Sequence, residues 1–220
     1  MMDLRSRLMQ QLRGWGPVGL LYILLCTFTP SSQTVLPETF LDRAIPFNPA
    51  GVWIYLSFFI LVPLTYLVVD TPTLRWLTRA LQASGVVAGT IFLLWPTTLH
   101  YPTIVDKSVS AQFLVWMQKW DSRCNCLPSL HAALTVLCAW ALSKTKNFLV
   151  TLAGFVWGLA ILYTVIQVRQ HVAVDLSAGM LLGLLSGIGA QLLQKRSLPD
   201  AHVASPVSHA SDSKVAQGLK

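Results

Sequence analysis

Six runs of mostly apolar residues constrain the fold more than any other feature of this sequence. They cover residues 17–28, 52–69, 81–99, 128–142, 148–166 and 171–193. A helix needs about 20 apolar residues to cross a bilayer, and several of the runs come close to that length. Of the 220 residues, 54% are hydrophobic and only 11% are charged, which is unusual for a soluble domain. We therefore expect an all-α fold, an integral membrane bundle of about six transmembrane helices.

The two ends of the chain differ in composition from the expected membrane domain, residues 17–194. Residues 1–16 carry three Arg among Leu and Met, which indicates a basic N-terminal segment. With the short apolar run behind it, this segment has the features of a signal peptide. No small-x-small cleavage site follows, so we interpret the run as the first transmembrane helix. Residues 195–220 contain no aromatic residue and many Ser, Ala and His, so we expect a disordered tail.

The positive charges indicate how the bundle is oriented. The formal net charge is +7 at pH 7, but the Lys and Arg residues lie in short segments between the apolar runs and at the chain ends. With six spans, eleven of them fall on the face that holds both termini and five on the opposite face. By the positive-inside rule the termini are then cytoplasmic, in a plasma or inner membrane. We expect no nucleic-acid partner, and the segments before residues 128 and 171 should face the outer or periplasmic side.

The longest polar connection, residues 100–127, contains one further helical pattern. Between residues 109 and 120, large apolar side chains recur at helical spacing. They are Phe113, Trp116, Met117 and Trp120. We expect an amphipathic helix here that lies on the membrane surface.

Small residues recur at every fourth position in the last two apolar runs. Gly154 and Gly158 lie in the fifth run, and Gly179, Gly183 and Gly187 lie in the sixth. Stripes of this kind let helix backbones approach closely. They could join two copies of the chain, but packing of the last two runs within one chain is the interpretation that we favour.

The stretch from Arg169 to Asp175 places ionisable groups between two apolar runs. If the last helix begins in this stretch, His171 and Asp175 lie one turn apart on the same face. A carboxylate at that spacing can accept the imidazole N–H and leave the other ring nitrogen basic, as a histidine nucleophile requires. The alternative is an interfacial His and Asp that only cap and solvate the start of a helix.

A second group of polar residues precedes the fourth run, in the segment Cys124-Asn125-Cys126-Leu127-Pro128-Ser129-Leu130-His131. Pro at the first helical position needs no N–H partner, so we expect the helix to start at Pro128. The N–H groups of the first turn would then form a phosphate site, and His131 could protonate a leaving oxygen. The alternative is a membrane helix that Pro and Ser cap, with an interfacial histidine.

Together, the motifs Pro-Ser-Leu-His and Arg-Gln-His-x3-Asp resemble those of the type 2 phosphatidic acid phosphatase superfamily. The resemblance covers roughly residues 81–194. It implies a six-helix lipid phosphatase or phosphotransferase that acts on a lipid phosphate without a metal or other cofactor. It also implies that His171 is the nucleophile that forms a phosphohistidine, that Asp175 orients it, that His131 is the general acid and that Ser129 binds the phosphate.

The sequence departs from the family pattern at its cationic residues. The signature Lys-x6-Arg-Pro would place its Lys at Leu94 and its Arg at Tyr101. The Ser-Arg pair expected before the second His falls on Thr164 and Val165. In this respect the chain is more similar to the divergent branch that includes inositol-phosphorylceramide and sphingomyelin synthases.

Other cations would then have to bind the phosphate. We expect Arg169 first, because it lies close to His171 in the sequence, and Arg123 or Lys107 as alternatives. A phosphodiester carries less negative charge than a monoester, so a site with fewer cations suits transfer between lipids. Both hydrolysis of a lipid phosphate and transfer of a phosphoalcohol from one lipid to another are therefore open.

Two further interpretations give the chain a metal site or a role without catalysis. Cys124, Cys126 and His131 could bind Zn²⁺, but a fourth ligand at the usual spacing is lacking, and we predict no metal site. The chain could also be a silent lipid-binding protein that keeps the fold without catalysis. The four cysteines do not resemble a disulfide framework, because two lie in apolar runs and a Cys-x-Cys pair would close a strained ring.

Overall fold

The computed structural model describes residues 3–26, 32–120 and 124–196. The longest helices are α1 (Leu4–Cys26), α5 (Thr71–Leu94), α8 (Phe148–Gln167) and α9 (Ala173–Arg196). Helices α4 (Phe58–Val68), α6 (Val109–Trp120) and α7 (Leu130–Ser143) are of intermediate length. The short elements are β1 (Thr34–Val35), α2 (Phe40–Ala44), η1 (Pro49–Gly51), α3 (Val52–Leu56) and β2 (Thr97–Thr98).

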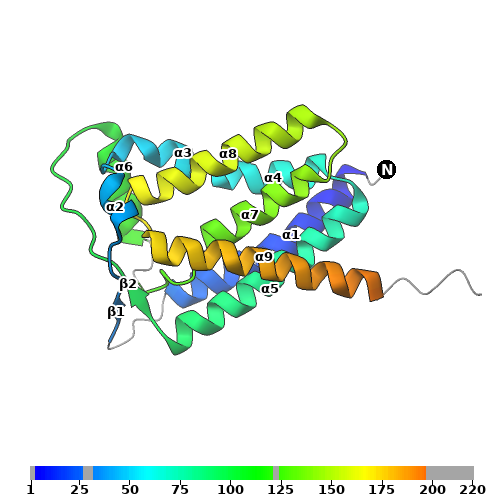
Figure 1. Cartoon of the computed structure of the whole chain (residues 1–220), viewed down its shortest axis with the longest axis horizontal. Coiled ribbons are helices and arrows are strands. Elements are labelled where there is room, and N and C mark those ends of the chain that lie inside the picture. The colour runs from blue at the N-terminus through cyan, green and yellow to red at the C-terminus, as the bar shows by residue number, and fades with distance from the viewer. Residues whose placement is uncertain (1–2, 27–31, 121–123, 197–220) are drawn as a thin grey trace, which may run out of the picture.

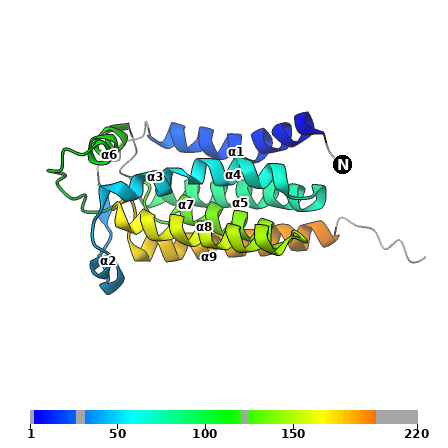
Figure 2. The same cartoon turned by 90° about the horizontal axis from the view of Figure 1, so that it is seen from above.

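The prediction of an all-α membrane bundle is confirmed, and the long helices run roughly side by side (Figures 1 and 2). Within the described residues, four helical segments are long and apolar enough to cross a membrane: Pro49–Val68, α5, α8 and α9. Helix α7 is apolar but shorter. Helix α1 does not meet this criterion, although it packs against α5 as part of the same bundle.

Two helices start earlier than the apolar runs suggest. Helix α1 already begins at Leu4, inside the basic segment. There the Arg7 guanidinium donates hydrogen bonds to three carbonyl oxygens at the end of α4, which ties the basic segment to the bundle. Helix α5 begins at Thr71 because Asp70 caps it: the carboxylate accepts a hydrogen bond from the Thr73 N–H at 3.0 Å.

The second apolar run is interrupted, but not at its proline, a residue type that often kinks a helix. Pro63 lies inside α4, and the break between α3 and α4 falls at Ser57. The Ser57 carbonyl accepts hydrogen bonds from the N–H groups of both Ile60 and Leu61 at 2.9 Å. The helix therefore restarts directly after the break.

Helix α7 is the central element, because α4, α5, α8 and α9 all pack against it. The glycine stripes of the last two helices face it. A Cβ added at Gly179 would collide with the Ser129 carbonyl oxygen, and one added at Gly183 with the backbone of Ala133. Gly154 of α8 likewise meets a side chain of α7. Packing within the chain is thus confirmed, although the partner of both stripes is α7 rather than the other stripe.

The connections that carry the two sequence motifs lie at one end of the bundle, beside α2, α6, β1 and β2 (Figure 1). The N-terminus and the C-terminal end of α9 lie at the other end (Figure 1). Strands β1 and β2 pair in parallel, and an isolated bridge joins Thr97 of β2 to Asn125. This pairing holds residues 124–127 beside the start of α7.

The helix predicted over residues 109–120 is present as α6 with the same bounds. Ala111, Leu114 and Gln118 are buried, whereas Trp116 and Trp120 are exposed. Phe113 and Met117 of the predicted stripe are half-buried and pack against the core, so the helix also contacts the bundle through part of its aromatic face. Its position on a membrane surface stays a prediction.

Candidate active site

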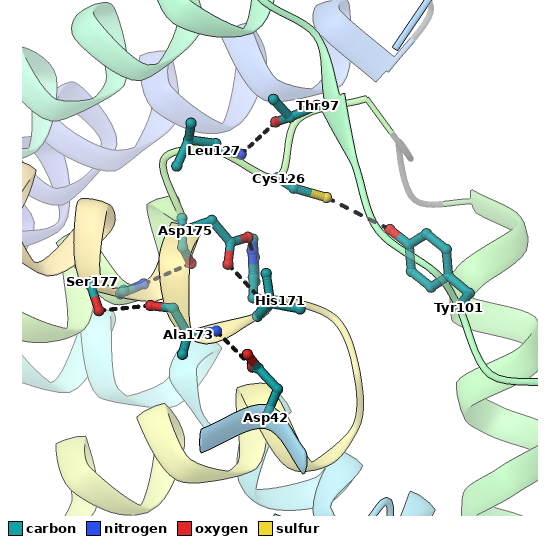
Figure 3. Close-up of polar contacts among 12 residues, drawn as sticks. Asp42, Thr97, Tyr101, Cys126, Leu127, His171, Ala173, Asp175 and Ser177 are labelled. Carbon is teal, nitrogen blue, oxygen red and sulfur yellow. Dashed lines mark hydrogen bonds and ion pairs between the residues drawn. The ribbon is translucent and has the colours of Figure 1, made fainter. Parts of the chain in front are cut away.

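His171 lies in the turn before α9, and Asp175 in the first turn of that helix holds its imidazole (Figure 3). The His171 Nδ1 atom lies 2.5 Å from Oδ2 of Asp175, which is the contact that the spacing predicts. An ionised Asp175 carboxylate would accept the proton of Nδ1 and leave the lone pair on Nε2. The second oxygen, Oδ1, accepts from the Val172 N–H at 2.8 Å. Asp175 is fully buried and His171 is 8% exposed, so the pair lies out of bulk solvent.

The turn between α8 and α9 determines where His171 lies. The Arg169 N–H donates to the Ile166 carbonyl at 3.0 Å, and the Gln170 N–H donates to the Val165 carbonyl at 3.2 Å. These two bonds form a Schellman turn at the end of α8. Arg169 adopts the left-handed conformation that this turn requires, with φ 55°, where glycine is the usual residue. Because position 169 is not glycine, the sequence does not predict this turn.

Asp42 is a residue of the site that sequence reasoning missed. Its Oδ1 atom accepts from the Ala173 N–H at 2.7 Å, at the start of α9 (Figure 3). Its Oδ2 atom accepts from the N–H and the hydroxyl of Thr39, each at 2.7 Å. The pattern Thr39-x-x-Asp42 is a visible capping signal for α2, but nothing local indicates its link to α9.

Helix α7 starts later than expected. Ser129 is its N-cap and Pro128 precedes the cap, because the Ser129 Oγ atom accepts from the Ala132 N–H at 3.3 Å. The Ser129 N–H donates to the Asp175 carbonyl at 3.0 Å, which ties the two helix starts together. Ser129 is fully buried and does not line the cavities described below. Its role as a phosphate ligand stays a prediction.

His131 faces His171 from the first turn of α7. The two ring centroids are 5.8 Å apart, and Tyr55 and Phe58 pack on His131 with centroid distances of 4.9 and 4.8 Å. The His131 Nε2 atom is buried and has no hydrogen-bond partner among the residues that the structure describes. The fold thus brings together two imidazoles, one from the first turn of α7 and one from the turn before α9.

Two cavities meet at His131. The first has a volume of about 10 Å³, room for about one water molecule, and its lining includes His171, Asn125 and Gln170. We call it the polar cavity. The second, the apolar cavity, has a volume of about 390 Å³. Its lining includes Trp15, Tyr22, Tyr55, Phe58, Trp116 and Leu134.

Of the three cations expected to bind phosphate, two line neither cavity and one lies outside the described residues. The Arg169 Nη2 atom donates to the Ile45 carbonyl at 3.0 Å, and Arg169 lines neither cavity. Lys107 is exposed and also lines neither. Arg123 lies outside the described residues. Phosphate binding by any of the three stays a prediction.

Both cysteines of the motif segment make side-chain contacts. The Cys126 Sγ atom lies 4.0 Å from the Tyr101 hydroxyl (Figure 3), and Cys124 Sγ accepts from Gln33 Nε2 at 3.0 Å. Across residues 3–26, 32–120 and 124–196, His, Cys, Asp and Glu form no group of three that could hold a metal ion. The proposed set of Cys124, Cys126 and His131 is therefore not assembled there.

A family model described as the PAP2 superfamily matches residues 33–188. This segment contains both motifs and most of the bundle. The chain belongs to the PAP2 superfamily. Its members are phosphatases or phosphotransferases, so membership supports phosphatase-type chemistry on a lipid phosphate, and with the four apolar helices it indicates an integral membrane protein. A search of curated proteins found no match.

Proposed function

We propose that this protein cleaves a lipid phosphate in two steps through a phosphohistidine. The Nε2 atom of His171 attacks phosphorus, the P–O bond to the lipid alcohol breaks, and His131 gives the leaving alkoxide a proton. An acceptor hydroxyl then loses its proton to His131 while its oxygen attacks phosphorus and the P–N bond breaks. The observation that carries the proposal is the 2.5 Å contact between His171 Nδ1 and Asp175 beside the facing ring of His131.

The apolar cavity supports a lipid as the substrate. It meets the polar cavity at His131, the residue proposed to protonate the leaving group. An ester oxygen near His131 would therefore have its hydrocarbon chain next to an apolar space of about 390 Å³. Filling such a space removes apolar surface from water, whereas a small soluble ester would leave it unused.

Transfer between two lipids, as in inositol-phosphorylceramide and sphingomyelin synthases, is the second candidate. It is favoured because no Lys or Arg lines the polar cavity in the described part of the chain. Product analysis on phosphatidic acid and on a phosphodiester lipid, with and without diacylglycerol or ceramide, separates the candidates. Free phosphate or phosphoalcohol indicates hydrolysis, a new phospholipid indicates transfer, and no turnover on any lipid favours a silent lipid-binding protein.

Replacing His171 by Ala should abolish turnover and the covalent label that a radioactive lipid phosphate leaves on the protein. His131→Ala should slow labelling by about 10²- to 10⁴-fold, because the leaving alkoxide would go unprotonated. Rapid-quench labelling of purified protein in detergent micelles measures both effects. The control is His100→Ala, since His100 is exposed and lines neither cavity. Substantial activity in His171→Ala would contradict the mechanism.

Orthovanadate should inhibit the enzyme, and EDTA should not. Vanadate can take the five-coordinate geometry of phosphoryl transfer on an imidazole nitrogen, as a transition-state analogue does. Both oxygens of Asp175 already accept hydrogen bonds, so this carboxylate is engaged in orienting His171. Activity lost on chelation and restored by Mg²⁺ or Zn²⁺ would count against the proposal.

A further inference from the structure

Several backbone donors at the two helix starts are already used. At α9, the N–H groups of Val172 and Ala173 donate to the carboxylates of Asp175 and Asp42. At α7, the first-turn N–H groups of residues 132 and 133 bond to the N-cap serine. These four groups are therefore engaged within the protein. A phosphoryl group in the polar cavity would need donors besides these four.

Two side-chain amides that line the polar cavity carry N–H groups that could donate to a substrate. Nδ2 of Asn125 and Nε2 of Gln170 are buried, and neither has a hydrogen-bond partner within the described part of the chain. Asn125 is 7% exposed and Gln170 is 5% exposed. Both line the cavity that also includes His131 and His171. Burying an N–H without a partner costs free energy, so two such groups at one site need a physical reason.

We propose that Asn125 and Gln170 are substrate-binding residues whose side-chain N–H groups donate to the non-bridging oxygens of the phosphoryl group that His171 attacks. This inference rests on the proposed function. The amides line the same cavity as the nucleophile and the general acid, where negative charge develops during phosphoryl transfer. Bound substrate would supply acceptors that the described residues do not offer these two amides.

The backbone holds both amides in place before substrate binds. Asn125 lies between two hydrogen bonds of 3.2 Å, from Thr97 N–H to the Cys124 carbonyl and from Cys126 N–H to the Thr97 carbonyl. The Gln170 N–H closes the Schellman turn at the end of α8. Donors fixed in this way need little reorganisation when the substrate binds, which is how preorganised sites stabilise charge.

Neutral donors also affect which substrate charge the site accepts. The ammonium of Lys or the guanidinium of Arg would gain strongly from a second negative charge on the phosphate, whereas an amide dipole gains less. A site built on Asn125 and Gln170 therefore suits a singly charged phosphodiester better than a doubly charged monoester.

Asn125→Asp and Gln170→Glu test the binding role, because each keeps the side-chain shape and replaces donors by acceptors. Asn125→Ala and Gln170→Ala remove the donors without adding charge. We expect the inhibition constant of orthovanadate to rise about 10- to 100-fold in each, the loss typical of one hydrogen bond to a charged group. The matched control is Gln118→Glu. Gln118 is also buried, and its Nε2 has no partner among the residues that the structure describes, but it lies outside both cavities.

The measurement uses the full-length protein in detergent micelles, with the melting temperature recorded for each variant. Unchanged vanadate inhibition in the folded variants at both positions would overturn the binding role and leave the His171 mechanism standing. If vanadate fails to inhibit the unaltered protein, the proposed function and this inference both fall. If neither variant at one position folds, the variants at the other position decide the test, since the proposal requires both amides to act.

Gln170→Lys tests the charge argument. A cation at this position should raise kcat/KM for phosphatidic acid relative to a phosphodiester lipid by about 10-fold or more, because the monoester carries the extra negative charge. The same ratio in the variant and the unaltered protein would overturn the charge preference.

Discussion

At the scale of single residues, Asp42 shows how a side chain distant in the sequence holds the start of α9 beside His171, the proposed nucleophile. The carboxylate is fully buried and accepts hydrogen bonds from Ala173 and Thr39. Asp42→Ala would leave the buried Ala173 N–H and the half-buried Thr39 donors without this acceptor, so we expect a loss of about 2–4 kcal/mol in stability. The start of α9 would also loosen beside His171, and kcat should fall. Thermal unfolding and steady-state kinetics in micelles measure the two effects.

The control for Asp42 is Glu38→Ala on the same connection, because Glu38 is exposed. It should leave the melting temperature and kcat close to those of the unaltered protein. An Asp42→Ala protein as stable as this control would show that the three hydrogen bonds contribute little to the fold.

At the scale of elements, the packing of α9 on α7 sets the distance between the two imidazoles. Gly179 lies at this contact, where an added Cβ would meet the Ser129 carbonyl and the Ala132 side chain. Gly179→Ala should therefore push the helices apart, lower stability by about 1–3 kcal/mol and reduce kcat. The matched control is Gly189→Ala on the same helix, where nothing lies within 4 Å of the added Cβ. Equal kinetics in the two variants would contradict this account.

At the scale of the whole molecule, the candidate site lies at the end of the bundle away from the start of α1 and the end of α9 (Figure 1). The split of eleven to five positive residues predicts cytoplasmic termini and chemistry on the outer leaflet. On a background without Cys124 and Cys126, an impermeant thiol reagent should label cysteines placed at 107 or 123 in intact cells. It should label those at 75 or 144 only after permeabilisation. The reverse pattern would move the reaction to the cytoplasmic face and leave the His171–Asp175 contact unaffected.

The sequence by itself determined the class of fold and the family. Apolar runs specify membrane helices because each helix satisfies its own backbone hydrogen bonds, so length and composition suffice. The contact of His171 with Asp175 was equally predictable, because both lie within one helical turn. Helix α6 followed from its own period of apolar residues, and its observed bounds match the predicted ones.

Only the tertiary structure decided which other residues lie around the His171–Asp175 pair. Asp42 meets a backbone N–H 131 residues away, and Asn125 and Gln170 reach the same cavity from separate connections. The Arg169 guanidinium points toward Ile45. This direction depends on a left-handed backbone conformation that an arginine in the sequence does not predict. The packing of both glycine stripes on α7 depends on how several helices share one core. These contacts join segments far apart in the chain, and periodicity and spacing carry information only about neighbours within a few turns.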